Sequence, residues 1–110
     1  MVAKSVTLHP DAEQEYLSSL SWYSGRSPTA AANFEEEFSS AIARIAEAPD
    51  RWPSYLNNCR RYILHQFPFS IVYQVLPSGI LVFAVAHAHR RPGYWEKRLR
   101  WRGPEPAGEQ

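Results

Sequence analysis

The chain has 110 residues, of which 45% are hydrophobic and 21% charged, and its formal net charge is +1. This length and balance are typical of one globular domain and exclude an intrinsically disordered protein. The longest apolar run, Ile80 to Ala86, is too short for a membrane span, which needs about 20 residues. The single Cys59 excludes an internal disulfide, and the N-terminus does not resemble a signal peptide, so we expect a cytoplasmic protein.

Two amphipathic helices are predicted in the first half of the chain. A β-prone stretch, Val6–Leu8, precedes them, and Asp11 should cap or open the first helix. The apolar stripe of that helix consists of Ala12, Tyr16, Leu17, Leu20 and Tyr23. Ser27 and Pro28 suit the cap and first position of a second helix, which should end near Ala48. Its buried stripe consists of Phe34, Phe38, Ala41, Ile42 and Ile45. The short turn between the helices predicts an antiparallel hairpin.

The second half predicts three β-strands at Arg60–Gln66, Phe69–Leu76 and Ile80–His87. Their short connections favour an antiparallel meander, so the fold class is α+β with the two helices packed on the sheet. The middle strand is apolar on both faces, so the second face needs a cover from the C-terminal tail or from another chain. A short helix after Gly93, anchored by Trp95 and Leu99, could supply it. We expect a single domain over residues 1–101 and a disordered tail over 102–110.

Charge is divided unevenly along the chain. Residues 1–59 hold four basic and eight acidic residues, a balance of −4, whereas residues 60–110 hold eight basic and three acidic residues, a balance of +5. Such asymmetry points to a polyanion or an acidic protein surface as partner. The alternative is that the basic half serves solubility and forms salt bridges with the acidic helices.

Two arginine pairs and two histidines are the candidate functional side chains of this basic half. Arg60 and Arg61 begin the first strand of the meander, whereas Arg90 and Arg91 follow its last strand, so the topology alone does not guarantee that the pairs meet. His87 and His89 share one strand face and have a spacing that can chelate zinc. We find no third ligand on the neighbouring strands, so we expect local hydrogen bonding, no metal and no cofactor.

Two segments resemble the ParE/RelE toxin superfamily. The first begins Phe67-Pro-Phe and runs to Val75, and the second runs from Val82 to Trp95. The second matches the family's His-x-x-Arg-x-Pro-x-x-Trp ending through His87, Arg90, Pro92 and Trp95. The resemblance covers residues 4–99 and implies the toxin of a type II toxin–antitoxin pair, neutralised by a cognate antitoxin with which it forms a hetero-oligomer. ParE-like members poison DNA gyrase, whereas RelE-like members cut mRNA on the ribosome.

The resemblance also implies site residues. In a RelE-like, metal-independent endoribonuclease, the catalytic residues would be Arg61, Arg90 and Tyr94, but two cationic positions of such enzymes fall on Ser70 and Ile63. The resemblance therefore favours a ParE-like gyrase poison, with the nuclease as the alternative. We expect the target-binding residues to be Arg60, Arg61, Arg90, Arg91, Tyr94 and Trp95. A third hypothesis is a noncatalytic nucleic-acid-binding module that places the arginines on phosphates and stacks Tyr94 or Trp95 on bases.

Overall fold

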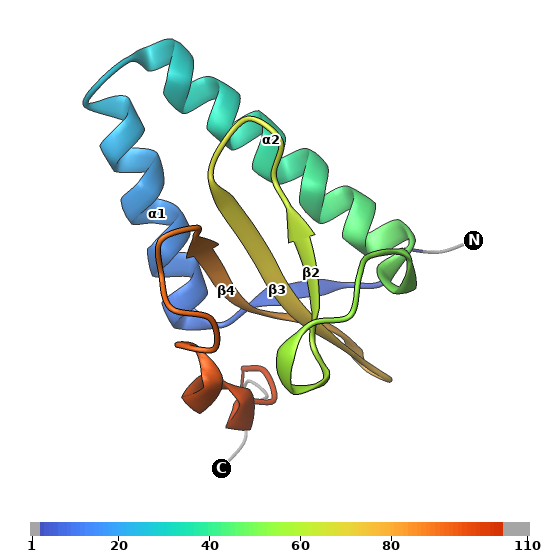
Figure 1. The fold of residues 1–110 in the computed structure, drawn as a ribbon. Helices are drawn as coiled ribbons and strands as arrows, with labels where there is room; N and C mark the ends of the chain where they lie inside the picture. Colours follow the sequence, from blue (N-terminus) through green and yellow to red (C-terminus); the bar gives the residue numbers. More distant parts are fainter. Residues whose placement is uncertain (1–2, 105–110) are drawn as a thin grey trace.

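The computed structural model describes residues 3–104, and the predicted disordered tail falls outside it from residue 105 onward. A hairpin of two helices packs against a four-stranded sheet, and the C-terminal turns lie beside the start of α1 (Figure 1). None of the described helices is long and apolar enough to cross a membrane. The elements in chain order are β1 Val6–Leu8, α1 Pro10–Ser24, α2 Pro28–Glu47, η1 Pro49–Arg51, η2 Leu56–Asn58, β2 Arg60–Ile63, β3 Phe69–Leu76, β4 Gly79–His87 and η3 Glu96–Arg100.

The helix starts follow local capping chemistry, with one difference from the prediction. α1 is capped by His9, whose Nδ1 accepts a hydrogen bond from the Asp11 backbone N–H at 2.9 Å. Asp11 therefore lies in the first turn and does not cap the helix, because Pro10 already occupies its first position. The predicted cap of α2 is confirmed: the Ser27 hydroxyl accepts from the Ala30 N–H at 3.2 Å.

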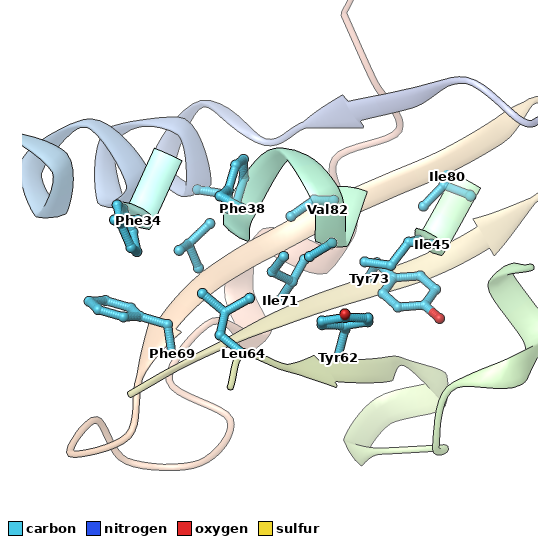
Figure 2. Packing of buried hydrophobic residues seen from close by; sticks show 13 residues of the cluster. Phe34, Phe38, Ile45, Tyr62, Leu64, Phe69, Ile71, Tyr73, Ile80 and Val82 are labelled. Carbon is cyan, nitrogen blue, oxygen red and sulfur yellow. The ribbon is translucent and has the colours of Figure 1, made fainter. Parts of the chain in front are cut away.

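The helix hairpin buries the predicted stripes against one face of the sheet. Phe34, Phe38 and Ile45 of α2 pack on Ile71 and on other apolar side chains of β2, β3 and β4 (Figure 2). The stripe of α1 is correct except for Leu17, which is 45% exposed. Leu17 adjoins the stripe in sequence, but a helix turns by about 100° per residue, so the position after Tyr16 already faces outward.

The sheet has the strand order β1-β4-β3-β2 and is mixed, so the expectation of an antiparallel sheet holds only for β2, β3 and β4. β1 pairs in parallel with β4, from Val6 opposite Ile80 to Leu8 opposite Val82. The meander leaves the outer edge of β4 without a strand partner, and β1 pairs with its first half. Sequence patterning indicates that a strand exists but does not indicate which edge it joins.

Strand β2 is shorter than predicted and ends at Ile63 instead of Gln66. The backbone amides of His65 and Gln66 donate to the carboxylate of Glu37 on α2, and the bond from Gln66 measures 3.0 Å. These amides are therefore satisfied by a side chain instead of by β3, which ends the strand pairing at this point.

The second face of the sheet has its own small core. Trp95 is 1% exposed and packs with Cys59, Val72 and Ala84, while Leu99 lies against the edge of this cluster. The predicted cover from the C-terminal segment is thus confirmed, although the segment after Gly93 forms turns and the 3₁₀-helix η3.

Candidate functional site

A depression with basic walls lies on the second face of the sheet, between the strands β2, β3 and β4 and the segment that follows β4. We call it the basic hollow. Its volume is about 100 Å³, and it is lined by Tyr55, Arg61, Ser70, Val72, Ala86, His87, Ala88, Arg90, Arg91, Pro92, Tyr94 and Trp95. The structure therefore brings Arg61 together with Arg90 and Arg91, which the strand order alone did not guarantee.

Two of the three arginines of the hollow rest on aromatic rings. The guanidinium carbon of Arg61 lies 4.1 Å from the centre of the Tyr55 ring, and that of Arg90 lies 3.7 Å from the centre of the Tyr94 ring. A guanidinium stacked on a ring keeps its N–H donors at the edge, where they can bind carboxylate or phosphate oxygens. The hollow is suited to holding an anionic group.

Arg60 does not belong to this site, although it adjoins Arg61 in sequence. Successive strand residues point to opposite faces of a sheet, and Arg60 lies on the helix side. There its guanidinium donates to the backbone carbonyl of Trp52 at 2.6 Å and lies 3.9 Å from the carboxylate of Asp50. Its contacts are with η1 and the following residue, which gives it a structural role.

The two aromatic residues expected to bind the target differ in their surroundings. Trp95 is part of the core beneath the hollow, so it supports the site from below and offers no ring face for stacking. The Tyr94 ring carries Arg90, while its hydroxyl donates to the carboxylate of Glu15 at 2.8 Å. Burial and this hydrogen bond to an anion raise the pKa of Tyr94 well above its ordinary value.

The two positions where a RelE-like nuclease would carry cations lie on the same face as Arg61. Ser70 lines the hollow, and Ile63, which pairs with it on β2, is 57% exposed. A hydroxyl and an alkyl side chain therefore stand at these positions. Neither can stabilise negative charge on a phosphoryl group as a guanidinium does.

His87 lies at the edge of the hollow, and the local hydrogen bond that we expected for it in place of metal binding is present. Its Nδ1 accepts a hydrogen bond from the His89 backbone N–H at 3.0 Å, which leaves Nε2 to carry the ring proton. Within residues 3–104, no cluster of three His, Cys, Asp or Glu side chains could hold a metal ion. The sequence places His87 at the end of β4, opposite Phe69, and this position could have indicated that His87 lies at the site.

An apolar groove of about 590 Å³ adjoins the hollow and shares His87 with it. The other lining residues include Trp22 and Tyr23 of α1 and Pro68 and Phe69 before and on β3. Trp22 is 54% exposed. Basic and apolar surfaces are thus continuous at the C-terminal end of β4.

Comparison with known families now places the chain. The sequence model for the ParE toxin of the type II toxin–antitoxin system parDE matches residues 6–92. The chain belongs to the ParE toxin family. Comparison with curated protein sequences gives no match. Among solved structures, the isolated E. coli RelE toxin is similar, with a TM-score of 0.55 and 20% sequence identity over 89% of this chain and 98% of the RelE chain.

Family and fold agree with the resemblance found in the sequence. The RelE similarity, at 20% identity, establishes the shared fold. The ParE match identifies this chain as a toxin of a type II toxin–antitoxin system, which implies an antitoxin as its partner. The basic hollow and the apolar groove are therefore surfaces of a ParE-family toxin.

Proposed function

We propose that this ParE-family toxin poisons DNA gyrase, that it does so through the basic hollow, and that a cognate antitoxin neutralises it. The observation that carries the proposal is the composition of the hollow. Arg61 and Arg90 are held on aromatic rings as anion-binding groups, while the positions expected to be cationic in a nuclease are Ser70 and Ile63. Such a site favours binding over phosphoryl transfer.

The hydrogen bond and the raised pKa of Tyr94 also favour gyrase poisoning over RNA cleavage. A tyrosine that assists RNA cleavage must exchange its proton with the reacting groups. The Tyr94 hydroxyl instead donates to Glu15, and its raised pKa holds the proton on the ring oxygen. A poison that holds gyrase on cleaved DNA needs binding contacts only, and an arginine stacked on Tyr94 supplies one of them.

A ribosome-dependent endoribonuclease is the second candidate, and His87 is the observation in its favour. This histidine lies where the hollow meets the apolar groove, and an imidazole is the side chain most often used as a general acid or base. The fold shared with the RelE toxin is compatible with the endoribonuclease hypothesis. The two candidates predict different lesions in the cell, so one expression experiment separates them.

The test begins with induced expression in bacteria, alone and with the antitoxin. Expression alone should arrest growth and produce gyrase-dependent double-strand breaks, and co-expressed antitoxin should prevent both. In vitro, purified toxin should trap gyrase as a cleaved complex, visible as linear plasmid after protein removal. Arg90→Ala should reduce this product about tenfold, since a charge-assisted hydrogen bond is lost.

Arg44→Ala is the matched control, because Arg44 is an exposed arginine of α2 outside the hollow. It should leave gyrase trapping unchanged. Mapping of mRNA 5′ ends after induction tests the alternative. Rapid cleavage at fixed codon positions, lost in His87→Ala and accompanied by intact chromosomal DNA, would show that the toxin is a ribonuclease.

A further inference from the structure

The outer edge of β4 has a strand partner along only part of its length. β1 ends at Leu8, opposite Val82, and β4 continues to His87. The register shift of β4 against β3 follows Val82, and beyond it the Phe83 carbonyl and the Val85 N–H have side-chain partners from α1 and η3. Backbone groups at such an edge need partners, and side chains provide them here.

The side chain of Glu15 on α1 is the centre of these contacts. Its Oε1 accepts from the Val85 N–H at 3.0 Å and from Arg98 at 3.1 Å. Its Oε2 accepts from the Tyr94 hydroxyl and from Arg98, both at 2.8 Å. Arg98 also donates to the Phe83 carbonyl at 2.9 Å. One carboxylate thus receives four hydrogen bonds from β4 and from the C-terminal segment.

This network continues into the basic hollow through Tyr94. Its hydroxyl is fixed by Glu15, and a hydrogen bond at the end of a phenol holds the direction in which the long axis of the ring points. The guanidinium of Arg90 lies against that ring at 3.7 Å, whereas Arg98 lies farther away, at 5.2 Å from the ring centre. The orientation of the ring therefore sets where Arg90 presents its donors.

We infer that Glu15 is a positioning residue of the basic hollow: through Tyr94 it holds Arg90 in the orientation that binds the target. The inference rests on the proposed function, since it assigns Arg90 to target binding. The side chains of Glu15 and Arg98 are only 17% and 15% exposed, so water competes weakly with their ion pair. An ordinary surface pair would not hold a neighbouring ring in place.

The first experiment measures the position of Arg90 without any assay of toxicity. The Arg90 guanidinium carbon lies 3.7 Å from the centre of the Tyr94 ring, so the NMR signal of the attached Nε–H should be shifted upfield of that of exposed Arg44. Glu15→Gln should move the signal toward that of Arg44. Glu13→Gln should not, because Glu13 is an exposed acid of the same helix. An Arg90 signal that is unchanged in Glu15→Gln would overturn the inference.

The second experiment is a double-mutant cycle on gyrase trapping. Glu15→Gln alone should weaken trapping about tenfold, because it removes the charge that holds Tyr94 and Arg98. In an Arg90→Ala background the same change should weaken trapping less than twofold, since its effect passes through Arg90. A purely structural role would reduce trapping equally in both backgrounds, and that result would contradict the inference.

Tyr94→Phe keeps the test decisive if Glu15→Gln does not fold. It removes only the hydroxyl and should produce a smaller loss, about threefold, with a partial change in the Arg90 signal. Unchanged trapping and an unchanged signal in this variant would overturn the inference. If the native toxin traps no gyrase, the proposed function fails, but the NMR comparison still decides whether Glu15 positions Arg90.

Discussion

The second core under the hollow should contribute a large part of the stability of the toxin, and Trp95 is its largest member. Trp95→Ala removes a ring that is 1% exposed and packed against Cys59, Val72 and Ala84. A buried tryptophan removes about 150–250 Å² from water, which at about 25 cal/mol per Å² amounts to roughly 4–6 kcal/mol. Measured truncations of buried aromatic residues cost about 3–5 kcal/mol. We therefore expect a loss of about 4 kcal/mol.

Urea denaturation followed by circular dichroism measures this loss, because a small domain unfolds in one cooperative transition. Trp22→Ala is the matched control, since Trp22 is 54% exposed on α1 and its removal should cost about 1 kcal/mol or less. Equal losses in the two variants would refute the reasoning. They would mean that the C-terminal segment covers the sheet without stabilising it.

Two further predictions concern the backbone and the alkaline stability. Gly79 has a φ of +145°, and a Cβ at this position would lie 2.6 Å from the Ser5 hydroxyl oxygen. Gly79→Ala should therefore destabilise the fold by about 2 kcal/mol, whereas the control Gly25→Ala should not. Equal melting temperatures of the two variants would contradict this prediction. Burial raises the pKa of the Cys59 thiol from 9.0 to about 11, so the unfolded chain loses this proton first and stability should fall as pH rises from about 9 to 11. Cys59→Ala should make that fall shallower in pH-dependent denaturation, and an unchanged slope would contradict the assignment.

The sequence predicted the elements well where one periodicity dominates. The α2 stripe is buried as expected because Phe34, Phe38 and Ile45 recur at helical spacing in a helix whose start is capped by Ser27. The prediction that Leu17 is buried was wrong, because apolar character alone does not show which face of a helix a residue occupies. The parallel pairing of β1 could not be predicted for a different reason: a three-residue strand carries no signal for its partner, which depends on the open edge left by β4.

The residues of the basic hollow could be predicted in part, and the limits are physical. Arg61 and Arg90, which the sequence put forward, line the hollow, whereas Arg60 lies on the other face of the sheet, because adjacency in sequence hides the alternation of strand faces. Glu15 was missed altogether, since its partners lie 70 to 83 residues away and nothing in a helical acid indicates a distant phenol. Long-range polar contacts of this kind can be identified only from the three-dimensional structure.

Part of the charge difference between the two halves of the chain is neutralised by contacts within the molecule. Four acids of the first half contact groups of the second half: Glu15 and Asp11 pair with Arg98, Asp50 lies beside Arg60, and Glu37 accepts from the backbone after β2. Within the part of the chain that the structure describes, Arg61, Arg90 and Arg91 form no ion pair. Ion pairs with acids of the first half therefore involve Arg60 and Arg98, whereas the three arginines that line the basic hollow are among those of the second half that form none within the described residues.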